Sequence, residues 1–164
     1  MSVSVELLEL LDYSDHERHK WREWIAAAPQ RMEIPFQTGE RFPTIGALFD
    51  HIFLVERRHL SRLQGGTPPD ATGVTAGDWK ALFEYADLVR TNLRRYLADL
   101  EDTGSREVLT VVVRTGPSQT MSKRRLATHI LLHEIRHTAQ IAYAARNAGQ
   151  EPPGQHDLFY FAER

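Results

Sequence analysis

The chain has 164 residues with 20 basic and 22 acidic side chains, which gives a formal net charge of −2. The length suits one domain over residues 1–164, and the basic residues form no tract, which argues against nucleic-acid binding. The absence of cysteine excludes disulfides, thiolate ligands and a cysteine nucleophile. No signal-peptide pattern opens the chain and no apolar stretch is long enough to cross a bilayer, so we expect a soluble cytoplasmic protein with no membrane partner.

The first helix is predicted over residues 5–28. Apolar residues recur there at helical spacing, and Pro29 ends the pattern. His16 and His19 lie in a polar patch in the middle of this segment, and we expect both to be solvated. Residues 29–43 contain proline and glycine without any period, which predicts a long connection.

Two further helices follow. Thr44 is suited to cap a second helix over residues 44–64, which the glycines and prolines of residues 65–77 terminate. A third helix is predicted over residues 78–102, because apolar side chains recur along it in one stripe.

The last part of the chain is predicted to contain a strand, a helix and a tail. Residues 107–114 are rich in β-branched side chains and run into a turn, which predicts one arm of a short hairpin. Ser122 is suited to cap a fourth helix that extends to about Asn147. Residues 150–164 form a tail after this helix, and the apolar residues near its end predict that the tail folds back on the helices. The fold class expected from these elements is all-α: a four-helix bundle with a short β-hairpin-like element between helices three and four.

Three histidines, His129, His133 and His137, recur at steps of four within the fourth predicted helix. This spacing places them on one helix face. Apolar residues share that face: Leu126, Ile130, Ile141, Ala144 and Ala148. We therefore expect His133 and His137 to point inward. Two imidazoles one turn apart can share a metal ion; the alternative is that each is a core histidine hydrogen-bonded to a neighbour.

The same segment contains the five-residue pattern HExxH, formed by His133, Glu134 and His137. In zinc peptidases the two histidines bind zinc and the glutamate activates water. Two observations argue against a peptidase here. The extended pattern with a glycine and a third histidine is absent, and only 27 residues follow His137.

A third ligand would have to come from another helix, and the second helix offers His51 and His59. On helical geometry alone, His59 lies nearer the apolar stripe, whereas His51 falls about 100° from its centre. The residues by themselves leave the choice open with a lean towards His59. The alternative role of His59 is that of a half-buried side chain bonded to a neighbouring helix.

Two segments carry a family resemblance. Residues 44–51 read TIGALFDH, and residues 131–141 read LLHEIRHTAQI. Together with the helix order, the β interruption and the proline-rich tail containing Asp157, they resemble the DinB/YfiT superfamily of metal-binding four-helix bundle proteins over nearly the whole chain. The resemblance implies that His51, His133 and His137 hold a divalent metal, with water in the open positions.

The resemblance also implies an activity. Several relatives are transferases or isomerases that act on small molecules with a low-molecular-weight thiol, and homodimers are expected. Three histidines suit zinc, nickel or iron(II). Because this chain has no cysteine, a sulfur nucleophile must come from a thiol cosubstrate. Many members read His-Arg-Gly-Gln after the last ligand, whereas residues 137–140 here read HTAQ, so a substrate contact made by that arginine is in doubt.

The sequence leaves two roles open for Glu134. It is either the general base of a metal-dependent hydrolase, which would make it catalytic, or a carboxylate on the helix surface near Arg136 or Lys123. A non-catalytic module that binds a metal or senses a ligand is a further alternative to an enzyme.

Overall fold

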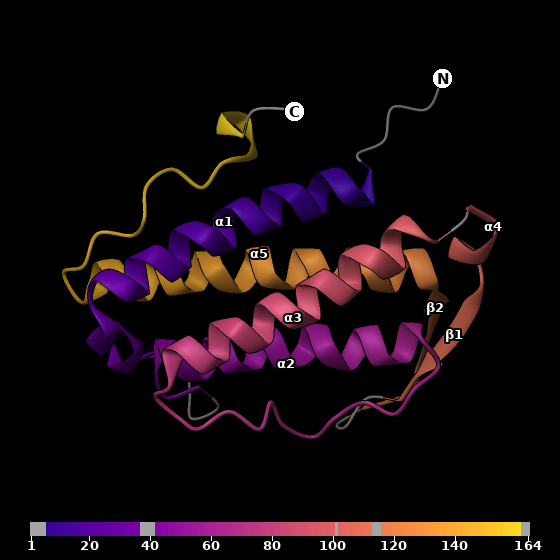
Figure 1. The fold of residues 1–164 in the computed structure, drawn as a ribbon, viewed down its shortest axis with the longest axis horizontal. Helices are drawn as coiled ribbons and strands as arrows, with labels where there is room; N and C mark the ends of the chain where they lie inside the picture. Colours follow the sequence, from indigo (N-terminus) through magenta and orange to yellow (C-terminus); the bar gives the residue numbers. More distant parts are fainter. Residues whose placement is uncertain (1–5, 37–41, 101, 113–115, 162–164) are drawn as a thin grey trace.

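The computed structural model describes residues 6–36, 42–100, 102–112 and 116–161. It is mostly helical (Figure 1). Four long helices dominate: α1 (Leu7–Ala27), α2 (Ile45–Leu63), α3 (Trp79–Ala98) and α5 (Lys123–Asn147). The short elements are two 3₁₀ helices, η1 (Pro29–Glu33) and η2 (Leu158–Tyr160), the helix α4 (Asp102–Ser105), and the strands β1 (Val108–Val111) and β2 (Gln119–Ser122).

Each long helix packs against two others. The helix α2 contacts α3 and α5, and α1 contacts the same two helices from the other side (Figure 1). The strands β1 and β2 form an antiparallel hairpin in which Val108 pairs with Ser122, so the predicted hairpin is confirmed. None of the described helices combines the length and apolar character needed to cross a membrane.

Local capping explains where three of the helices begin. The side chains of Thr44, Asp78 and Ser122 each accept a hydrogen bond from the backbone N–H three residues later. Such a bond satisfies one of the N–H groups that the first helical turn leaves without a partner. The predicted caps at Thr44 and Ser122 are therefore confirmed.

One predicted boundary is wrong, and one predicted connection is partly helical. The third helix ends at Ala98 rather than near residue 102, and a separate single turn, α4, follows it. The connection after Pro29 is not wholly irregular, because η1 forms its first five residues. Residues 37–41 of that connection, and the end of the predicted strand at residues 113–114, lie outside the described residues.

The tail returns along α1 and is held there by its backbone (Figure 1). The indole N–H of Trp24 donates to the carbonyl oxygen of Glu151 over 2.7 Å, and the Tyr13 hydroxyl donates to the carbonyl oxygen of His156. The predicted return of the tail is thus confirmed. Its aromatic residues anchor it less than expected, since Phe159 is 88% exposed.

The apolar core consists of two clusters with buried charged side chains between them. One contains large aromatic side chains: Trp21, Phe49, Phe53 and Phe83. The other is mostly aliphatic, with Leu11, Leu60, Leu93 and Leu126 among its members. Between them lie four buried charged residues that pair with one another, one from each long helix: Arg18 of α1, Glu56 of α2, Arg90 of α3 and Glu134 of α5. We call these four residues the charged layer.

Candidate metal centre

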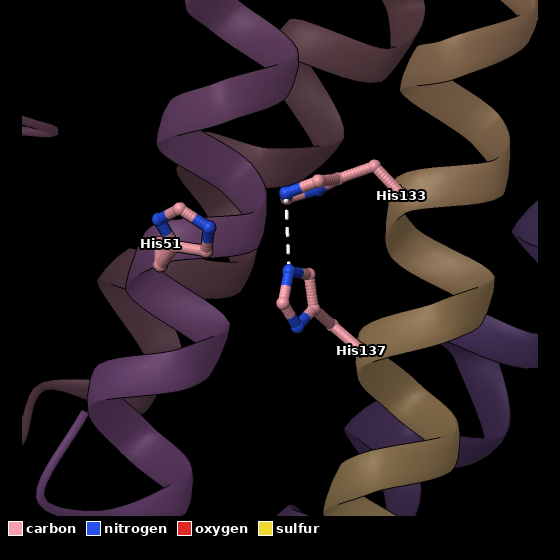
Figure 2. A group of neighbouring side chains, drawn as sticks. All are labelled: His51, His133 and His137. Atoms are coloured by element: carbon pink, nitrogen blue, oxygen red, sulfur yellow. Dashed lines mark hydrogen bonds between the residues drawn. The ribbon is translucent and has the colours of Figure 1, made fainter. Parts of the chain in front are cut away.

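Three histidines converge where α2 faces α5. His51 comes from α2, and His133 and His137 come from successive turns of α5 (Figure 2). One nitrogen of each ring lies within 4.8 Å of the corresponding nitrogens of the other two. The structure thus brings together the three residues that the family resemblance implied.

The spacing of the nitrogens fits a shared metal ion. The Nε2 atoms of His133 and His137 are 3.1 Å apart. With metal–nitrogen bonds of about 2.1 Å, this separation corresponds to an angle of roughly 95° at the ion. His51 would have to move its ring nitrogen closer by up to about 2 Å to complete the same geometry.

The imidazole of His133 is held in the neutral form, which is the form that binds metals. Burial, followed by the neighbouring His137 and His51, lowers the pKa of His133 to about 2. A neutral ring keeps a lone pair on one nitrogen for a metal. The ring of Phe42 covers this group, with its centroid 4.5 Å from that of His51 and 6.3 Å from that of His137.

Gln140 orients one of the rings. The side-chain oxygen of Gln140 lies 2.6 Å from Nδ1 of His137, one turn along α5. As an acceptor, this oxygen fixes the proton of His137 on Nδ1 and leaves Nε2 available to a metal. The sequence pattern contained this residue without revealing its role, because only the spacing of three residues from His137 hints at it.

Replacing Gln140 by leucine is expected to weaken metal binding while keeping a half-buried side chain of similar size. Loss of an outer hydrogen-bond partner of a metal ligand costs roughly 10- to 100-fold in affinity. Competition with a chromophoric chelator would measure this change. Gln140→Glu, which retains an acceptor oxygen, serves as the control and should keep most of the affinity. Equal affinities for wild type and Gln140→Leu would contradict the proposed orienting role.

A cavity of about 980 Å³ lies beside the metal centre. It opens between α2 and the loop that precedes α3, and His51 and Phe42 contribute to its wall. On its rim the hydroxyl of Thr72 donates to the carboxylate of Asp50 over 2.6 Å, which ties the loop to α2. The cavity is large enough for a small organic molecule next to a metal held by His51.

His59 and His129 are not members of the three-histidine group. They lie side by side further along the same two helices, with ring centroids 5.3 Å apart. The lean towards His59 as a ligand, drawn from helical geometry, is therefore wrong. His16 and His19 of α1 are exposed, as expected.

Glu134 lies in the charged layer. It is 4% exposed, and the guanidinium of Arg18 donates to both of its oxygens, over 2.8 and 2.9 Å. Ser14 and Arg90 also donate to it. The reading of Glu134 as a surface carboxylate near Arg136 or Lys123 is thus wrong. Its role as a general base stays a prediction, but the contacts favour a structural role.

The rest of the charged layer was missed in the sequence. Arg90 contacts Glu56 over 2.9 Å, and Arg18 donates to Glu56 as well. Burial raises the pKa of Glu134, but the charge of Arg18, and then that of Arg90, outweighs it and lowers this pKa to about 2. The sequence did contain a signal for these buried charges. Each member of the charged layer stands seven positions from apolar residues on both sides, so it occupies a position in the inward stripe of its helix.

The fold and the site together define a helical protein whose three clustered histidines can hold a divalent metal ion. A family model described as the DinB family matches residues 1–163, so the chain belongs to the DinB family. A search of curated proteins finds no significant match.

Proposed function

We propose that this protein is a metal-dependent enzyme of the thiol-dependent transferase or isomerase type, built as a four-helix bundle, that acts on a small molecule. The observation that carries the proposal is the convergence of three imidazoles beside a cavity. Membership of the DinB family supports it. Zinc, nickel and iron(II) all suit the ligand set.

The residues of the chain have distinct parts in this proposal. His51, His133 and His137 would hold the metal, and three protein ligands leave open positions, as is typical of catalytic sites. When bound, a divalent metal lowers the pKa of a thiol or a water molecule and so supplies a nucleophile near neutral pH. Gln140 keeps His137 in the required tautomer, and Phe42 packs against the rings of His51 and His137.

A hydrolase that uses Glu134 as its general base is a weaker candidate. The carboxylate of Glu134 already accepts hydrogen bonds from Ser14, Arg18 and Arg90. A base must be free to take a proton from a substrate or water within hydrogen-bond reach. A cytoplasmic location and a homodimeric state, with no nucleic-acid or membrane partner, complete the proposal.

Thiol consumption is the direct test of this function. Protein loaded with zinc, nickel or iron(II) would be incubated with low-molecular-weight thiols and a panel of electrophiles, and loss of free thiol would be followed. We expect metal-dependent turnover that disappears in His137→Ala. The exposed His19 provides a matched control, since His19→Ala should keep full activity.

Three outcomes decide between the candidates. Metal-dependent consumption of a thiol together with an electrophile supports the proposal. Hydrolysis without a thiol, lost in Glu134→Gln with the metal retained, would favour the hydrolase. Stoichiometric metal without either activity would contradict an enzymatic role and leave a module that binds a metal or ligand.

A further inference from the structure

A row of imidazoles continues beyond the metal centre. The ring of His129 lies 5.6 Å from that of His133, and the ring of His59 lies 5.3 Å from that of His129. His59 belongs to α2 and His129 to α5, as do the metal ligands themselves. These two helices therefore carry two neighbouring histidines to which the proposed metal chemistry gives no role.

A neighbouring arginine fixes the tautomer of His59. A guanidinium nitrogen of Arg62 lies 3.2 Å from Nδ1 of His59. Arginine can only donate, so Nδ1 of His59 must be the acceptor. A neutral imidazole has one N–H, which in His59 is then on Nε2. His59 thus presents a hydrogen-bond donor, and a ring nitrogen that carries a proton does not bind a metal.

The charges around this pair are positive and uncompensated. Within the described part of the chain, neither Arg62 nor Arg136 forms an ion pair, in contrast to the buried Arg18 and Arg90. Burial, and then the nearby Arg62, lower the pKa of His59 to about 3. Arg136 lies seven residues after His129 on α5, and so on the same helix face. A cation would be repelled here, whereas an anion would find donors.

We propose that His59, His129, Arg62 and Arg136 form a binding subsite for the carboxylate of a small molecule whose other end reaches the metal centre. The second half of this statement rests on the proposed function. His129 lies four residues from His133, and His59 lies eight residues from His51, which is about 6 and 12 Å along a helix. The ligand is therefore a bifunctional molecule with its carboxylate at roughly that distance from its metal-binding group.

Nuclear magnetic resonance of the histidine rings tests the subsite directly. Full-length protein labelled with ¹⁵N-histidine would be titrated with hexanoate and, as the uncharged probe, hexanol, both zinc-loaded and metal-free. We expect His59 in the Nε2–H form and ring signals of His59 and His129 that shift with hexanoate alone. In Arg62→Gln/Arg136→Gln the hexanoate affinity should fall roughly tenfold or more.

The control removes the same charge elsewhere. Arg95 and Arg124 are exposed on α3 and α5, and Arg95→Gln/Arg124→Gln should bind hexanoate like wild type. Equal losses in both double variants would show a general charge effect and contradict the subsite. So would the Nδ1–H form of His59, or a second equivalent of zinc that is lost in His59→Ala.

A second measurement links the subsite to the metal. Cobalt-loaded protein would be titrated with mercaptohexanoate and mercaptohexanol, and the thiolate-to-metal absorption band would be followed. We expect the carboxylate to strengthen binding about tenfold in wild type and not in Arg62→Gln/Arg136→Gln. Thiol binding without this preference would overturn the subsite and leave the proposed function intact. Hexanoate binding without any thiolate-to-metal band would support the subsite and contradict the proposed function.

Discussion

Purified His133→Ala protein is expected to lose the stoichiometric metal that the wild type carries after metal-replete expression. His133 is the central ring of the cluster, with centroids 5.1 Å from His51 and 4.3 Å from His137. Two remaining histidines on different helices cannot enclose an ion as three do. The loss of affinity should exceed the roughly 10- to 100-fold that removal of an outer partner costs. Elemental analysis and a competitive chelator titration would measure it.

The matched control is His129→Ala. His129 lies one turn before His133 on the same helix and outside the three-histidine group. Its replacement should leave the metal content at one equivalent. If His133→Ala kept its metal, or if the wild type bound none in metal-replete conditions, the three histidines would have to be regarded as core residues that hydrogen-bond to one another.

The helices could be predicted well because their beginnings are encoded locally. Thr44 and Ser122 each stand directly before an apolar period, and both cap the helix that follows. The end of α3 was not encoded in this way. The apolar stripe continues to Leu100, yet the helix stops at Ala98, because the chain then turns into α4 and the hairpin. A tertiary turn of this kind overrides the local pattern.

The third histidine of the group could not be assigned from helical periodicity. A stripe centre indicates the direction of the core as a whole, but α2 contacts both α3 and α5. His51 lies on the flank that faces α5, well away from the centre of the stripe. His59, nearer the centre, meets His129 instead. The family resemblance supplied the pairing of helices that a single helical pattern lacks.

The role of Glu134, on the other side of α5, also could not be predicted from a single helix. Its neighbours in the sequence suggested either a general base beside a metal, because HExxH is a linear pattern, or a carboxylate on the helix surface. Its partners Arg18 and Arg90 lie on α1 and α3, more than forty positions away in the chain. Only the packing of the four helices reveals that these charges neutralise one another.

Replacing Glu134 by glutamine is expected to lower the free energy of unfolding by about 3–5 kcal/mol, because it leaves Arg18 and Arg90 buried with one carboxylate fewer. Both arginines are about 5% exposed, so water cannot take the place of that carboxylate. Chemical denaturation followed by circular dichroism would measure the loss. Glu84→Gln, on the exposed face of α3, is the control and should change stability by less than about 0.5 kcal/mol.

The charged layer also predicts a rescue. Replacing all four of its members together, with Arg18→Met, Glu56→Leu, Arg90→Met and Glu134→Leu, should restore most of the stability lost in Glu134→Gln. Apolar residues of similar volume avoid the cost of burying charges, and such replacements are often neutral or stabilising by about 1–4 kcal/mol. Metal content should stay at one equivalent in both variants, since no ligand is altered. Wild-type stability in Glu134→Gln combined with lost turnover would instead identify Glu134 as a catalytic base.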